Sequence, residues 1–345
     1  MLRKRFILKM FTIANVTKIM NAIVKCHGSL RLMAYCFLII GIAFSSCQPN
    51  SCMIEPSICY APQPWLIEKL PASFPELTPK ERSEDWAKEF MMGRAFAREM
   101  DFYRALTCFK RALLLIPKKI EARRLQIEYE IFLAYYVANK YEEAIETFEN
   151  GQLFYVSESF PALHDLLIAL YDAYNQIDKP ERAYCFWSLL YAVNPDDAIG
   201  LTVETSVLDA DLKSIEQAAQ NHPTETSVSQ FLCDYEFQAK SISKAQTLNA
   251  LLPGAGYYYV GQKKAALTSF LINTLFIAAS YQLFDRGYIP GAIILTSLEM
   301  GWYFGGINGA GLAAKEYNER LYETLGKEML INNRLFPILM FQKGF

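Results

Sequence analysis

Zinc-type spacings are missing from this sequence. Histidine occurs only at His27, His164 and His222, and none of the three stands at a ligand spacing from a cysteine. The eight cysteines contain no pair separated by two residues, which is a common spacing in zinc sites. We therefore expect no bound metal.

Short catalytic and nucleotide-binding motifs are missing as well. The chain contains no GxSxG, HExxH, Walker or Rossmann sequence. A catalytic triad assembled from distant residues leaves no such motif, so an enzyme stays an alternative. The main expectation is a protein that is not an enzyme and uses no cofactor.

An excess of basic residues is the third absence. The 34 lysines and arginines are offset by 36 aspartates and glutamates, and they form no stripe with interleaved aromatic residues. The formal net charge of −2 gives no general attraction for phosphates. Nucleic acid is therefore not expected as a partner.

Apolar residues, by contrast, are abundant. Hydrophobic residues make up 52% of the chain and charged residues 20%. This proportion of hydrophobic residues is high for a soluble protein, so we expect part of the chain to lie in lipid. A chain of 345 residues also predicts two or three structural units.

The amino-terminal segment has the layout of an export signal. Residues 1–31 carry seven basic residues and no acid, and an apolar run at residues 32–44 follows. At about 1.5 Å per residue this run is too short to cross a hydrocarbon core of about 30 Å. Residues 1–46 are therefore predicted to be a cleaved signal, with Met20 and Met33 as alternative start sites.

The residues after the apolar run, Ser45, Ser46 and Cys47, resemble the lipobox of bacterial lipoproteins. That resemblance implies lipidation of Cys47. The alternative is a plain signal, with Cys47, Cys52 and Cys59 as disulfide candidates in an oxidising compartment. Residues 47–80 are rich in proline, which disfavours helix, and are predicted to form a tether.

An internal period of 39 residues follows the tether. Ala105, Ala144 and Ala183 are separated by two equal intervals of 39, and an aromatic residue stands four positions after each. A fixed period in this range predicts stacked helical hairpins. The alternative is an ordinary helical bundle in which alanines and aromatic residues recur by chance.

The repeated pattern resembles the tetratricopeptide repeat, most closely in residues 86–119. The matching positions there are Gly93, Phe96, Ala105, Phe109, Ala112 and Pro117. Weaker units occupy about 125–158 and 164–197. A degenerate fourth unit extends to residue 240 and is expected to cap the array. The whole array is predicted to cover residues 81–240. Phe132 and Tyr171 replace the small residue of the family, which predicts splayed hairpins.

The resemblance also implies a concave groove for a peptide or protein partner. The residues carried over to its inner face are Arg94, Ala97, Gln126, Tyr129, Leu133, Tyr136, Asp165, Asp172 and Asn175. This mixture of charges suits an amphipathic or mixed-charge peptide, and Tyr129 and Tyr136 are the expected hot spots. The alternative is that both tyrosines pack under a neighbouring helix.

Two apolar runs near the carboxyl end, residues 265–284 and 288–307, predict a transmembrane helical hairpin. Gly301, Gly305, Gly309 and Ala313 recur every four residues and predict a packing face toward Ser269 and Asn273 of the first run. Glu299 lies inside the second run. We interpret it as a structural hydrogen-bond partner of Asn273 or a headgroup-level residue, with a proton or ion site as the alternative.

Residues 253–262 precede this hairpin and resemble the PGxGxxYxGQ signature of two-helix membrane modules of bacterial proteins. The proline and glycines of this stretch are expected to break any helix, and Tyr257 departs from the usual glutamine of the family. The likeness covers about residues 241–318 and implies membrane location. The predicted membrane module is 241–320, and 321–345 is predicted to be a tail. Flanking lysines favour cytoplasmic repeats, but the export signal favours extracytoplasmic ones and is given more weight.

The sequence as a whole predicts an all-α protein, in which a tetratricopeptide-like helical-hairpin array is followed by a transmembrane helical hairpin. Its expected function is a protein-interaction scaffold of the bacterial cell membrane or envelope, with a peptide or protein and membrane lipid as partners. The alternative is a structural or transport-accessory component in which the membrane module is the functional part.

Overall fold

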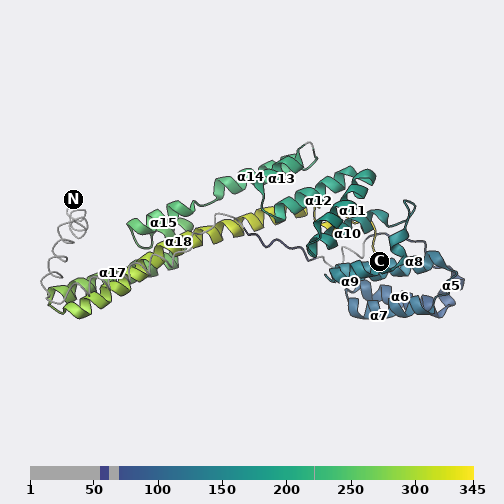
Figure 1. The fold of residues 1–345 in the computed structure, drawn as a ribbon, viewed down its shortest axis with the longest axis horizontal. Helices are drawn as coiled ribbons and strands as arrows, with labels where there is room; N and C mark the ends of the chain where they lie inside the picture. Colours follow the sequence, from purple (N-terminus) through teal and green to yellow (C-terminus); the bar gives the residue numbers. More distant parts are fainter. Residues whose placement is uncertain (1–54, 62–69, 221) are drawn as a thin grey trace. The chain divides into compact units, whose positions relative to one another are not determined.

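The computed structural model describes residues 55–61, 70–220 and 222–345, and these residues contain helices and no strand (Figure 1). The all-α class is therefore confirmed. The predicted export signal and Cys47 lie outside the described residues. The chain forms two compact units: Lys240–Tyr317, which we call the hairpin unit, and Ile54–Ala239 with Asn318–Phe345, which we call the repeat unit.

The repeat unit is built from helices that pack mainly as successive pairs, α6 with α7, α8 with α9, α10 with α11 and α12 with α13. A short helix precedes these pairs, and a 3-10 turn follows α9. Two further helices and the end of a long helix, described below, follow α13 in this unit. The elements are α5 (Pro79–Ser83), α6 (Asp85–Arg98), α7 (Phe102–Leu115), α8 (Glu121–Val137), α9 (Tyr141–Asn150), η1 (Gln152–Tyr155), α10 (Leu163–Gln176), α11 (Pro180–Val193), α12 (Pro195–Leu208), α13 (Leu212–Ala219), α14 (Glu225–Gln238) and α19 (Pro337–Met340).

The turn inside each pair uses the same backbone device. In each pair, one non-glycine residue between the two helices adopts a positive φ. These residues are Met100, Asn139, Asp178 and Ala210, with φ of 63°, 57°, 57° and 54°. The first three recur at the 39-residue period of the sequence. The left-handed residue reverses the chain after the first helix and lets the second helix begin two residues later.

Gly93 explains the close approach of α6 and α7. A Cβ atom at this position would lie 2.5 Å from two ring carbons of Phe109, so no larger residue fits without moving the ring. Phe132 and Tyr171 hold the corresponding positions in the next two pairs. The expected splaying of those pairs stays a prediction.

The last pair is covered by a helix that the sequence did not predict at this place. Helix α18 extends over Ile289–Asn332, so it does not end near residue 307, and residues 321–332 are helix rather than an irregular tail. Its Tyr322 is fully buried and donates a hydrogen bond to the carbonyl of Val207 at 2.9 Å. The rings of Phe231 and Tyr235 on α14 pack against Tyr322, with centroids 5.2 and 5.4 Å away.

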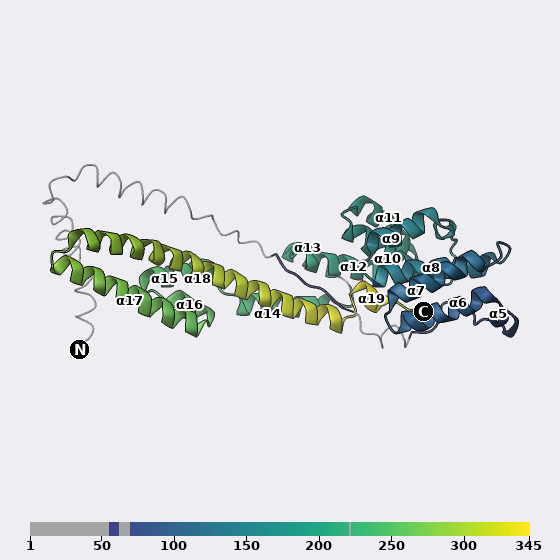
Figure 2. The ribbon, with the colours of Figure 1, turned by 90° about the horizontal axis from the view of Figure 1, so that it is seen from below.

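The hairpin unit contains α15 (Ile242–Leu251), α16 (Ala255–Val260), α17 (Lys263–Asp285) and the first part of α18. Helices α17 and α18 lie side by side in both ribbon views, and Gly287, with φ of 78°, lies in the turn between them (Figures 1 and 2). Among the described helices, α17 is the one long and apolar enough to cross a bilayer by length and composition. The apolar run of α18 does not meet that standard.

The glycines of the 253–262 stretch are required by geometry. Gly254 has φ of 92°, and its amide donates to the Asn249 side chain at 2.9 Å. A Cβ atom on Gly256 would lie 2.2 Å from the carbonyl oxygen of Ala245. The expectation that the stretch contains no helix is wrong, because α16 forms between the breaks at Gly254 and Gly261.

The predicted packing face on α18 is wrong in part. A Cβ atom on Gly301 or Gly305 would meet no atom of the described residues within 4 Å. One on Gly309 would lie 2.2 Å from the hydroxyl of Tyr257, and Ala313 is buried in a cluster with Ala245 and Val260. Only the second half of the strip is therefore a contact face, and it faces α15 and α16.

The expected pairing of Asn273 with Glu299 is also wrong. The Asn273 amide donates to the carbonyl of Ser269 at 2.6 Å, one turn earlier on its own helix. Glu299 is 7% exposed, and its carboxylate oxygens have no hydrogen-bond partner in the described part of the chain.

Candidate peptide-binding groove

The first helix of each pair contributes the inner face on which the partner residues were predicted. Helices α8 and α10 are buried around most of their circumference, as shown by consecutive buried positions at residues 126–134 and 165–171. A helix with one face open to solvent keeps polar residues on that face. These two helices are therefore covered on the inner side as well as by their paired helices.

The cover is the chain itself. Residues 335–345, which we call the strap, follow a turn at Arg334, whose guanidinium donates to the carbonyl of Leu339 at 2.8 Å. Seven large apolar residues of the strap are at most 9% exposed: Leu335, Phe336, Ile338, Leu339, Met340, Phe341 and Phe345. Such burial is worth about 1.5–3 kcal/mol for each large side chain, so the strap is a firmly bound part of the repeat unit.

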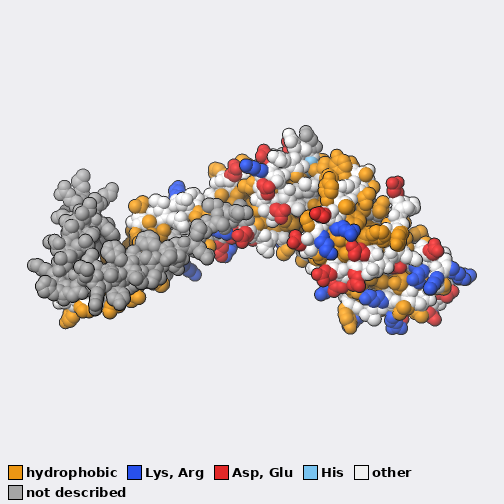
Figure 3. All heavy atoms as spheres, in the orientation of Figure 1, with side chains coloured by type: hydrophobic (Ala, Val, Ile, Leu, Met, Phe, Trp, Pro, Cys, Tyr) orange, Lys and Arg blue, Asp and Glu red, His pale blue; other side chains and the backbone are white. Residues whose placement is uncertain are grey.

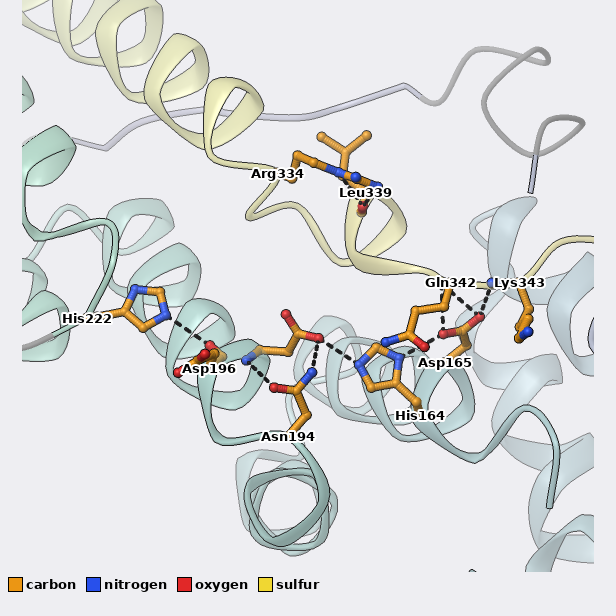
Figure 4. Close-up of polar contacts among 10 residues, drawn as sticks. His164, Asp165, Asn194, Asp196, His222, Arg334, Leu339, Gln342 and Lys343 are labelled. Carbon is orange, nitrogen blue, oxygen red and sulfur yellow. Dashed lines mark hydrogen bonds and ion pairs between the residues drawn. The ribbon is translucent and has the colours of Figure 1, made fainter. Parts of the chain in front are cut away.

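Asp165 on α10 is the main polar anchor of the strap. It is 1% exposed, and its two carboxylate oxygens accept the main-chain amides of Gln342 and Lys343 at 3.0 and 2.8 Å (Figure 4). The neighbouring His164 joins it to α12: Nδ1 of His164 lies 2.9 Å from Asp165, and Nε2 lies 2.7 Å from Asp197. Charge-assisted contacts of this kind are stronger than neutral ones.

Two phenylalanines of the strap fit against aromatic residues of the array. The ring of Phe341 lies 5.8 Å from the ring of Tyr136, whose hydroxyl donates to Asp172 at 2.6 Å. The ring of Phe345 lies 6.3 Å from that of Phe102. Of the predicted residues, Asp165 and Tyr136 therefore contact the strap directly. Asp172 is linked to it through its hydrogen bond with Tyr136.

The carboxyl end of the strap is held by main-chain contacts. The Arg98 guanidinium donates to the Phe345 oxygen at 3.4 Å, and the Gly344 amide donates to the carbonyl of Pro71 at 3.1 Å. Residue 344 forms an isolated parallel bridge with Ala72. The strap is therefore bound in extended form over its last residues.

The other predicted residues lie under different parts of the unit. Tyr129 is 1% exposed and packs against Phe74 and Phe160, with ring centroids 5.9 and 5.7 Å away. Gln126 accepts from Arg123 at 2.8 Å. The placement of Tyr129 agrees with the alternative of a tyrosine packed in the interior.

Residues 70–77 lie within the predicted tether, but they do not form a free tether, because Phe74 packs against Tyr129.

Arg94, Ala97, Leu133 and Asn175 complete the predicted set. Arg94 lies 3.6 Å from Glu130, which is 2% exposed. Ala97 and Leu133 are buried, and Asn175 is half-buried. Sequence reasoning missed His164, Arg98 and Asp197, because none of them belongs to the family pattern.

Charges are distributed without a single dominant sign. On the visible face of the repeat unit, basic and acidic side chains are interspersed (Figure 3). Inside the array, burial raises the pKa of Glu130 to about 7, although Arg94 and Arg98 oppose that rise. Burial lowers the pKa of His164, but its hydrogen bonds to Asp165 and Asp197 outweigh burial and raise the pKa to about 9.

His164 makes the repeat unit sensitive to alkaline pH. Its pKa of about 9 exceeds the ordinary 6.5, so between these values the folded chain binds a proton that the unfolded chain has lost. The stabilisation is complete below pH 6.5 and disappears as pH rises through about 9. We expect the melting temperature to fall from pH 7 to pH 9.5, and to fall less in His164→Gln, measured by circular dichroism. Equal slopes in the two proteins contradict this origin.

A cavity of about 590 Å³ lies beside the strap at the start of α12. Its polar lining includes Asp196 and His222, whose ring nitrogens contact the Asp196 carbonyl at 3.0 Å and the Thr224 hydroxyl at 2.7 Å. Both ring nitrogens of His222 therefore have partners within the chain. The described residues include no cluster of potential metal ligands here or elsewhere.

No family model, no curated protein and no solved structure matches this chain.

Proposed function

We propose that this protein is a membrane-associated interaction scaffold whose helical repeats bind an extended segment of a partner protein. One observation carries the proposal: the inner face of the array binds an extended segment, residues 341–345, through main-chain hydrogen bonds and aromatic contacts. Recognition of an extended peptide by main-chain contacts, with pockets for selected side chains, is a recurrent binding mode.

The tetratricopeptide-like nature of the array is part of this proposal. It is supported by the four helix pairs, by the positive-φ turns at the 39-residue period, and by the contact between Gly93 and Phe109. Of these features, the contact between Gly93 and Phe109 involves residues on which the resemblance was based.

Membrane attachment is the second part of the proposal. Helix α17 has 23 residues, and only 11% of its most apolar stretch is buried within the chain. Exposed side chains such as Leu271 and Leu275, at 55% and 69%, lose contact with water if this helix lies in lipid. With the predicted export signal and lipidation of Cys47, this supports a bacterial membrane or envelope location with extracytoplasmic repeats.

A photocrosslinking experiment on the full chain in its native membrane tests the scaffold. A benzoylphenylalanine at Asn175, a half-buried residue that the resemblance assigns to the inner face, is expected to give adducts heavier than the protein. The matched control carries the same group at Tyr103 of α7, which is 85% exposed. Adducts at Tyr103 but none at Asn175 contradict the groove. Adducts that disappear when residues 263–307 are deleted favour the accessory function instead.

A further inference from the structure

The strap is attached to the groove in a manner that another chain could copy. Each hydrogen bond that joins residues 342–345 to the array or to Pro71 uses a main-chain atom of the strap: the amides of Gln342, Lys343 and Gly344 and the oxygen of Phe345. Main-chain atoms are common to all sequences. The side chains of residues 342–344 therefore contribute little to recognition.

Selectivity comes from the residues at the two ends of this stretch. Phe341 and Phe345 are 3% and 2% exposed, and each lies against an aromatic residue of the array. Aromatic side chains filling desolvated sites usually dominate the energy of an interface. We therefore expect the groove to bind selectively to segments with two aromatic residues four positions apart.

Asp165 adds a second requirement. Its carboxylate needs free amides on the two residues that follow the first aromatic residue. Proline lacks that amide, so it is excluded at both positions. The buried carboxylate is already held by His164, which fixes its orientation before any segment binds.

Building on the scaffold function proposed above, we infer that the partner presents an extended segment with aromatic residues four positions apart and no proline at the two positions after the first. The partner segment binds by displacing the strap, which is the resident ligand of the same site. The strap is covalently attached and competes at an effective concentration on the order of millimolar. The free groove is therefore rare until the strap is released.

The test uses the full chain in detergent micelles and a fluorescent peptide with the sequence of residues 335–345, LFPILMFQKGF. The double variant Phe341→Ala/Phe345→Ala weakens the resident strap. We expect the peptide to bind this variant at least tenfold more tightly than the unchanged chain, by fluorescence anisotropy. A peptide with alanine at the positions of Phe341 and Phe345 is expected to lose at least tenfold in affinity, whereas replacement of its Gln or Lys by alanine changes little.

A second chain keeps the test independent of stability in the double variant. It carries a protease site inserted after Asn332, so that the strap is cut without changing any of its residues. The labelled peptide is expected to exchange into the cut protein, and Asp165→Asn is expected to weaken that exchange at least tenfold. A folded, cut protein that does not take up the peptide overturns the inference, and so does dimer formation by exchange of straps between two copies.

The outcome separates this inference from the scaffold itself. Crosslinked adducts at Asn175 without peptide exchange support the scaffold function and contradict the proposed aromatic recognition pattern. Peptide exchange without adducts at Asn175 shows a groove that reads the pattern and removes the scaffold function.

Discussion

Replacing Asp165 by alanine is expected to release the strap and to lower the free energy of unfolding of the repeat unit by about 3–5 kcal/mol. The carboxylate is 1% exposed and accepts two main-chain amides of the strap. Its loss leaves the main-chain amides of Gln342 and Lys343 without their acceptor and removes one of the two carboxylates that hold His164. The cavity left by the side chain adds to this cost.

Hydrogen exchange provides the measurement. The amides of Gln342 and Lys343 are expected to exchange much faster in Asp165→Ala, because their protection depends on that carboxylate. Asp196→Ala is the matched control: Asp196 is an exposed acid at the start of α12, and its removal is expected to change stability by about 0.5 kcal/mol. Unchanged protection of the two amides in Asp165→Ala contradicts the anchoring role.

The helical repeats could be predicted because their signal is periodic. The 39-residue spacing of Ala105, Ala144 and Ala183 reflects the positions where paired helices touch, and all three residues are at most 1% exposed. Close packing allows only small residues at such contacts, so the pattern is carried by the sequence itself. The predicted units 86–119, 125–158 and 164–197 overlap helices α6 to α11, although α6, α8 and α10 begin before them, at Asp85, Glu121 and Leu163.

The strap could not be predicted because it has no period and lies far from its partner residues in sequence. Asp165 and Gln342 are 177 positions apart. Two weaker signals were nevertheless present. Residues 335–341 are apolar at every position, which does not suit an exposed tail. Residues 131–137 of α8 are apolar or aromatic at every position, which does not suit a helix beside an open groove.

Two predictions about α18 were wrong: where the helix ends, and which neighbour its glycines pack against. Membrane patterns end where charges begin, so the charged stretch after residue 314 gave no reason to extend the second apolar helix. A four-residue spacing places glycines on one helical face but does not identify the neighbour of that face. Gly306, outside the predicted strip, has Ser269 3.9 Å from its Cβ position.

Replacing Gly256 by alanine is expected to disrupt the packing of α15, α16 and α18 at a cost of about 3 kcal/mol. The added Cβ atom would lie 2.2 Å from the carbonyl oxygen of Ala245, and 2.8 Å from the Cβ atoms of Ala310 and Asn249. A backbone carbonyl cannot turn aside as a flexible side chain can. The helices must therefore separate, and the hydrogen bond from Gly254 to the Asn249 side chain is weakened with them.

Trypsin sensitivity in detergent reports this change, because Lys244 lies over the ring of Tyr259 on α16, 5.0 Å from its centroid. Cleavage after Lys244 is expected to become much faster in Gly256→Ala. Gly305→Ala is the control, since its Cβ atom meets no described atom within 4 Å and alanine favours helix over glycine by about 1 kcal/mol. If both variants resist trypsin equally, the close contact at Gly256 does not hold α15 and α16 together. If only Gly256→Ala is cut, Gly256 is required for a steric reason, which accounts for that position of the 253–262 stretch without any ligand.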